Sequence, residues 1–208
     1  MIVGYHVIFG AYGFWLPNDP RGSWSEFVGS WELFRHGSAT KTDERRSVAH
    51  RPHDRTTRLA AKTALQRPAA QFTGEQARAV GIGFAKYAAK AKLSIWACSI
   101  MPDHVHLVLG RHRLQVESLV VQLKGEATGV LLAKGLHPFV APDEVPTSVP
   151  KAFARGEWKV FLDVDDLDRA IRYVEQNPVK AGKPVQYWSF VTPYIDPEAG
   201  TPGNNEDV

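Results

Sequence analysis

Residues 94–109 read SIWACSIMPDHVHLVL, and this stretch decides how the rest of the chain is interpreted. Its two apolar runs, 94–100 and 104–109, are rich in β-branched and other large apolar side chains, which favours two β-strands. The segment 101–103, Met-Pro-Asp, is typical of a tight turn. The stretch therefore predicts two consecutive strands joined by a turn.

Strands and helices alternate on both sides of this stretch. Residues 2–10 predict a strand, and Thr73 with Gln76 forms a capping box that opens a helix. Further elements are expected as an amphipathic helix from Val116 to near Gly135, a strand over 158–162, and a last helix capped by Asp165 or Asp166 and ended by Pro178. This order predicts an α+β fold, an antiparallel sheet of the split βαβ layout with helices packed on one face.

A loop-rich insertion of about residues 13–70 follows the first strand. Its segment 41–67 carries eight Lys and Arg against three acidic side chains. Two interpretations stay open: a solvated segment, or an arm that contacts nucleic acid. The tryptophans available to stack on unpaired bases are Trp15, Trp24 and Trp31. His50 and His53 are expected to be exposed rather than to form a second metal site.

The bulk composition limits the class of protein. The 208 residues suffice for one domain, and Cys98 is the only cysteine, which excludes an internal disulfide. The beginning of the chain lacks signal-peptide features, and no apolar run reaches ~20 residues, so we expect a cytoplasmic protein and no membrane partner. Residues 1–194 hold 25 basic and 18 acidic side chains, a net charge of +7, which favours polyanionic partners. Residues 195–208 are acidic and predict a disordered tail.

His104 and His106 form the first candidate site. Side chains two apart on a strand share a face, so both imidazoles point the same way while Val105 and Leu107 face the core. Imidazole pairs suit several transition metals, and also Mg²⁺ when oxygen ligands complete the shell. Asp103 is a candidate outer partner of the pair. His-x-His is a common pattern, so two histidines that bind no metal remain an open alternative. A metal site here also needs a third group from elsewhere in the chain.

The last predicted helix offers such a group. Tyr173 and Asn177 are four residues apart and therefore neighbours on one helix face, which Arg169 shares. A tyrosine hydroxyl attacks phosphorus once it has lost its proton, for which its free pKa of ~10 is high. A divalent cation beside it stabilises the developing charge, and the amide oxygen of Asn177 is a suitable hard ligand. Taken alone, simple packing of Tyr173 and a helix-stop role for Asn177 remain open.

Two motifs together resemble a known family. MPDHVHLV, residues 101–108, resembles the HUH motif of single-tyrosine transposases, and RYVEQNPVKAG, residues 172–182, resembles the tyrosine-helix motif of their REP-associated, IS200-like branch. The resemblance covers about 2–10 and 71–194. It implies a ferredoxin-like fold and a catalytic domain over 1–194.

The same resemblance implies the chemistry. His104, His106 and Asn177 would bind Mg²⁺ or Mn²⁺, and Tyr173 would attack single-stranded or hairpin DNA to form a 5′-phosphotyrosine link. The alternatives are a non-catalytic or host-adapted DNA-binding protein on the same fold, and a metal-dependent phosphodiester hydrolase in which Tyr173 is structural. The oligomeric state, monomer or homodimer, stays open. The candidate DNA-phosphate contacts are Lys124, Arg169, Arg172, Lys180 and Lys183.

Overall fold

A computed structural model of the chain describes residues 1–16, 31–37 and 54–195. The predictions for Trp24, for His50 and His53, for residues 41–53 of the basic segment 41–67, and for the acidic tail beyond residue 195 lie outside these ranges. No described helix has both the length and the apolar character needed to cross a membrane.

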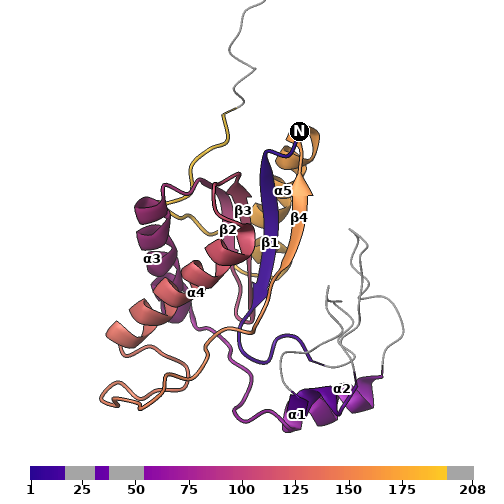
Figure 1. The fold of residues 1–208 in the computed structure, drawn as a ribbon, viewed down its shortest axis with the longest axis vertical. Coiled ribbons are helices and arrows are strands. Elements are labelled where there is room, and N and C mark those ends of the chain that lie inside the picture. Colours follow the sequence, from indigo (N-terminus) through magenta and orange to yellow (C-terminus); the bar gives the residue numbers. More distant parts are fainter. Residues whose placement is uncertain (17–30, 38–53, 196–208) are drawn as a thin grey trace, which may run out of the picture.

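The predicted α+β fold is confirmed: the four strands within the described ranges form one antiparallel sheet in the order β2-β3-β1-β4 (Figure 1). This is the strand order of the split βαβ layout. The strands are β1 (Gly4–Gly10), β2 (Ile95–Ile100), β3 (His104–Gly110) and β4 (Trp158–Leu162). The helices are α1 (Trp31–Phe34), α2 (Arg55–Thr63), α3 (Gly74–Ala91), α4 (Val116–Ala133) and α5 (Val164–Lys180).

The main core lies between one face of the sheet and the helices α3 and α4. Alternation along the strands turns Val7 and Phe9 of β1 and Leu107 of β3 into this core, where all three are fully buried. The two helices cross closely because Gly83 has no side chain: a Cβ there would lie 2.4 Å from the Cα of Ala127. This half of the fold matches the expectation of helices on one face.

Helix α5 differs from that expectation, because it lies on the opposite face of the sheet (Figure 1). Its apolar side chains Leu167, Ala170 and Val174 form a second cluster with Ala97 of β2 and Val108 of β3. The physical reason is that Val108 of β3 points to this second face, away from α3 and α4. An apolar side chain on this face is buried only when another element packs over it. The side chains of His104 and His106 share the face that α5 covers.

The helix ends follow their caps, with one correction. Thr73 and Gln76 form the predicted capping box of α3. Helix α5 is capped by Asp163, whose carboxylate accepts from Asp166 N–H, and not by Asp165 or Asp166. Asp163 is the cap because it directly precedes Val164, the first residue of the helix, and its carboxylate reaches the free N–H of Asp166. Pro178 lies inside the last turn, and the helix continues to Lys180.

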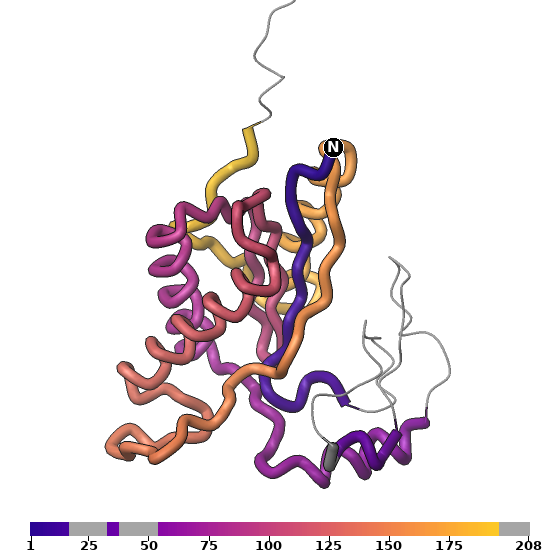
Figure 2. Tube along the Cα trace, viewed as in Figure 1, coloured from indigo at the N-terminus to yellow at the C-terminus, as the bar shows by residue number. Residues whose placement is uncertain are grey.

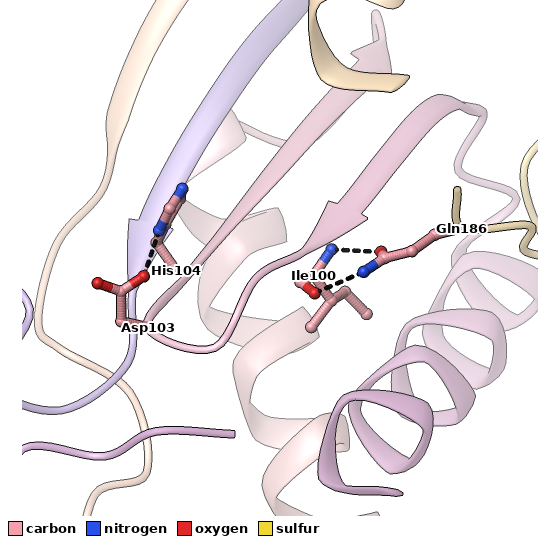
Figure 3. Close-up of polar contacts among 4 residues, drawn as sticks. All are labelled: Ile100, Asp103, His104 and Gln186. Carbon is pink, nitrogen blue, oxygen red and sulfur yellow. Dashed lines mark hydrogen bonds and ion pairs between the residues drawn. The ribbon is translucent and has the colours of Figure 1, made fainter. Parts of the chain in front are cut away.

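The segment after α5 covers the edge strand β2. The side-chain amide of Gln186 accepts from Ile100 N–H and donates to Ile100 C=O, both at 2.8 Å (Figure 3). Thr192 N–H donates to Ile95 C=O at the other end of the strand. This protects the backbone of an edge that would otherwise be open for pairing with another chain. Helices α1 and α2 of the insertion lie beyond the end of the sheet at which β1 finishes (Figures 1 and 2).

Candidate functional site

His104 and His106 lie at the start of β3, with their rings side by side. The ring centroids are 4.9 Å apart. His106 is buried, whereas His104 is partly exposed and packs against Phe14 at a centroid distance of 4.9 Å. Val105 and Leu107 point into the main core, as the alternation predicts. The strand therefore presents two imidazoles on the α5 face.

Asp103 contacts His104 directly. Its Oδ1 lies 2.6 Å from Nδ1 of His104, and Figure 3 shows the carboxylate beside the ring. The turn that carries Asp103 is held by Ala11 N–H, which donates to Asp103 C=O at 2.8 Å. This contact agrees with the prediction that Asp103 is an outer partner of the pair.

His6 of β1 is a member of the site that the sequence analysis missed. Its Nε2 lies 3.1 Å from Nδ1 of His106, and the two rings are stacked at an interplanar angle of 21°. Trp158 of β4 and Tyr173 of α5 contact the His6 ring edge-on, at centroid distances of 5.7 and 5.6 Å. The only signal in the sequence is that His6 occupies a non-core position of the first strand. Its neighbours depend on a pairing between residues 100 positions apart.

Tyr173 reaches the histidines from α5. Its ring centroid lies 5.7 Å from that of His106, and the side chain is 44% exposed. Burial of its inner part raises the pKa of the Tyr173 hydroxyl above 10.0. Lys180 places its ammonium 5.2 Å from the ring centroid of Tyr173. The structure thus brings the predicted tyrosine to the predicted histidine pair.

Asn177 lies one helical turn beyond Tyr173 on α5. Its side-chain Nδ2 is buried and has no hydrogen-bond partner. The hydroxyl of Ser99 is likewise buried without a partner, and Ser99 lies directly opposite His106 across the β2–β3 ladder. Oxygen and nitrogen of an amide are interchangeable by a flip, so Asn177 can present either atom. Buried polar atoms without partners are rare and suggest a ligand or water at such positions.

Burial keeps the inner histidines neutral. It lowers the pKa of His6 to about 4. The pKa of His106 falls well below 6.5, first through burial and then through the nearby His104 and His6. Neutral imidazoles keep a nitrogen lone pair, which a protonated ring lacks. At neutral pH these two rings are therefore in the form that a metal requires.

The donor set decides what the site can hold. Within the described ranges, no three His, Cys, Asp or Glu side chains gather in the geometry of a complete metal site. Two imidazoles of β3 are present, so a third protein ligand has to come from another residue type.

The predicted DNA contacts do not all face solvent. Lys124 donates from Nζ to the carbonyls of Ala154 at 3.0 Å and Gly156 at 2.6 Å, and it lies over the ring of Phe9. Burial lowers its pKa to about 8. An ammonium held in this way joins α4 to the segment before β4, which speaks against a phosphate contact. Arg169, Arg172, Lys180 and Lys183 are exposed, and Arg169 forms an ion pair with Asp166.

A basic hollow that the sequence analysis missed lies at the far end of β3. Its cavity volume is about 820 Å³. Lys90, Lys92, Arg111 and Arg113 line it, from the end of α3 and the segment between β3 and α4. Among the described residues, only Lys90 of these four has a carboxylate within ion-pair distance, Glu126 at 3.9 Å. The sequence shows these cations, but only the fold brings them around one cavity.

Comparison with known proteins gives a family match over part of the chain. Residues 64–137 match the model of the family described as transposase IS200 like. These residues include α3, β2, β3 with both histidines, and α4, but not Tyr173 or Asn177. No curated protein matches the chain.

Two solved structures are similar to the chain. One is the structure of a REP-associated tyrosine transposase bound to a REP hairpin, with 12% identity, a TM-score of 0.45, and coverage of 94% of this chain and 95% of that chain. The other is a protein of Deinococcus radiodurans R1 provisionally described as a transposase, with 14% identity, a TM-score of 0.40, and coverage of 85% and 91%. Over residues 64–137, which include both strand histidines, this chain is similar to the IS200-like transposases.

Proposed function

We propose that the protein is a metal-dependent transposase that cuts and rejoins single-stranded or hairpin DNA through a covalent bond to Tyr173. The observation that carries the proposal is the contact between Tyr173 of α5 and His106 of β3, two residues that come from the two separate motifs. A nucleophile beside imidazoles that can hold a cation suits metal-assisted phosphoryl transfer.

The proposed ligands are His104, His106 and Asn177, with Mg²⁺ or Mn²⁺. The contact with Asp103 supports the role of His104: when Nδ1–H donates to the carboxylate, Nε2 keeps its lone pair for the metal. The Nδ2 position of Asn177, which is buried without a partner and which the amide oxygen can occupy after a flip, supports its role as the oxygen ligand. When bound, the cation polarises the scissile phosphate and stabilises charge that develops on its oxygens.

Tyr173 supplies the nucleophile in the proposed reaction. Its oxygen loses its proton and forms a bond to phosphorus, the bond from phosphorus to the 3′-oxygen breaks, and the 3′-oxygen takes up one proton and leaves as a free hydroxyl. The product is a 5′-phosphotyrosine that conserves the phosphodiester energy for the reverse attack by a 3′-hydroxyl. Because burial raises the pKa of Tyr173, the hydroxyl stays protonated at neutral pH until positive charge near it favours the anion.

Cationic side chains near Tyr173 suit a DNA strand. Arg172 and Lys180 of α5 and Lys183 beyond it are exposed, and Lys180 lies against the tyrosine ring. We propose these residues as phosphate contacts close to the cut. The basic hollow of Lys90, Lys92, Arg111 and Arg113 is proposed as a second, more distant phosphate contact.

The test is detection of the covalent adduct. Purified protein is incubated with labelled single-stranded and hairpin DNA from the flanks of its own gene, with Mn²⁺, and separated on a denaturing protein gel. We expect a labelled protein band that disappears with a chelator and with Tyr173→Phe. Tyr187→Phe is the matched control, because Tyr187 is 89% exposed and lies outside the site; this variant should form the adduct normally.

The other outcomes identify the alternatives. DNA cleavage without an adduct, retained in Tyr173→Phe, would favour a phosphodiester hydrolase that activates water. DNA binding without cleavage in Mn²⁺ would favour a binding protein on the same fold. Either result would refute the role proposed for Tyr173.

A further inference from the structure

The hydrogen atom between the rings of His6 and His106 can belong to either ring. A neutral imidazole has one N–H and one nitrogen lone pair. Only 3.1 Å separates Nε2 of His6 from Nδ1 of His106, so one of these atoms donates the hydrogen to the other. The two possible arrangements differ in what they leave on the far nitrogen of His106, its Nε2.

In the first arrangement His6 donates from Nε2–H. Nδ1 of His106 is then the acceptor, the proton of His106 is on Nε2, and this ring has no lone pair to offer. In the second arrangement His106 donates from Nδ1–H to Nε2 of His6. Nε2 of His106 then carries the lone pair, and the ring is ready to bind a cation. Only the second arrangement is compatible with His106 as a ligand.

We propose that His6 is a positioning residue that accepts the hydrogen of His106 Nδ1 and so directs His106 Nε2 toward the metal. His6 would do for His106 what Asp103 does for His104, so both strand histidines would have their tautomer set by an outer partner. This inference rests on the metal-dependent function proposed above and adds to it a residue outside both motifs.

The surroundings of His6 keep its ring in place for this role. β1 is a central strand, and His6 is paired with Val108 of β3 on one side and Val160 of β4 on the other. Trp158, also of β4, and Tyr173 of α5 contact the ring edge-on. A ring that packs against β3, β4 and α5 cannot turn away without disturbing them, so its Nε2 remains directed at His106.

The experiment measures Mn²⁺ binding by calorimetry and by the electron paramagnetic resonance of free Mn²⁺, without DNA. His6→Leu removes the acceptor, and we expect the affinity for Mn²⁺ to fall about 10- to 100-fold. His6→Gln carries an amide oxygen close to the position of Nε2 and should restore binding to within a few-fold of wild type. His112→Leu is the matched control: it also removes a histidine with two hydrogen bonds, but on the far segment after β3, and its affinity should not change.

A second measurement does not depend on a variant. Nitrogen NMR of the wild-type histidines distinguishes protonated from unprotonated ring nitrogens. We expect His106 to be protonated at Nδ1 before metal is added, with the Nε2 signal shifting when diamagnetic Mg²⁺ binds. Protonation of His106 at Nε2 would overturn the inference, even if His6→Leu failed to fold.

The outcomes separate this inference from the proposed function. If the wild-type protein binds no Mn²⁺ and forms no adduct, the proposed function itself fails. If the wild type binds Mn²⁺ and His6→Leu binds it equally well, only the role of His6 is refuted. Equal weakening by His6→Leu and His6→Gln would also refute it, because that result would indicate loss of packing rather than loss of the acceptor.

Discussion

Replacing Lys124 by Met tests whether this cation stabilises the fold or contacts DNA. Met keeps the length of the side chain and its packing on Phe9, but it removes the two hydrogen bonds to Ala154 and Gly156 carbonyls. Burial lowers the pKa of Lys124 from 10.5 to about 8 in the folded protein. The unfolded chain keeps the ordinary value, so the two states bind protons differently between these pH values.

The sign and size of the effect follow from linkage. Above about pH 8 the folded state releases the proton of Lys124, while the unfolded state holds it until about pH 10.5. Stability rises with pH wherever the unfolded state binds more protons, by about 1.4 kcal/mol per pH unit for one proton. The free energy of unfolding of the wild type, minus that of Lys124→Met, should therefore increase by about 3 kcal/mol from pH 8 to 10.5.

Urea unfolding of both proteins at several pH values from 7 to 10.5 measures this difference. DNA affinity is measured beside it over a range of salt concentrations. We expect Lys124→Met to leave the affinity and its salt dependence unchanged. A difference in stability that is flat across this pH range would refute the buried ammonium. The slope of log K against log salt concentration falls in magnitude by about 0.7–0.9 when one phosphate contact is lost. A decrease of this size in Lys124→Met would show that Lys124 contacts DNA.

Three further predictions concern the site and the hollow. Asp103→Ala should lower the affinity for Mn²⁺ about tenfold in calorimetry, because His104 Nδ1 loses its acceptor; unchanged affinity would show that the contact has no such role. Asn177→Leu should also weaken Mn²⁺ binding, yet leave the thermal stability of the metal-free protein equal or higher, because the amide nitrogen is buried without a partner. A marked loss of stability would instead identify a structural amide. Arg111→Gln with Arg113→Gln should weaken binding of long DNA and reduce its salt dependence, with normal cleavage of short strands; equal binding by anisotropy would contradict a phosphate contact there.

The sequence predicted the local features of the site well. The alternation through Val105 and Leu107 placed both strand histidines on one face, and the spacing of Tyr173 and Asn177 placed them on one side of a helix. Both predictions depend only on the period of a strand or helix, which a few neighbouring residues set. The contact of Asp103 with His104 is of the same kind, because the two residues are adjacent.

The sequence could not predict the contacts that a side chain makes with residues far along the chain. Lys124 is basic and lies on a helix, which favoured a DNA contact, but its partners are carbonyls about 30 residues later. The face covered by α5 depends on how the apolar stripe of that helix meets Ala97 and Val108 of two earlier strands. Neither partner can be inferred from the local pattern of either segment.

What the sequence by itself determined is which residue types stand at which periods: two histidines on one strand face, and a tyrosine with an asparagine on one helix face. What only the tertiary structure decided is that these two faces meet, and that His6 lies between them with its ring against His106 and Tyr173. The physical reason is that hydrogen bonding along a strand specifies no partner. The register of β1 against β3 results from burying Val7, Phe9 and Leu107 together in one core, a property of the whole fold.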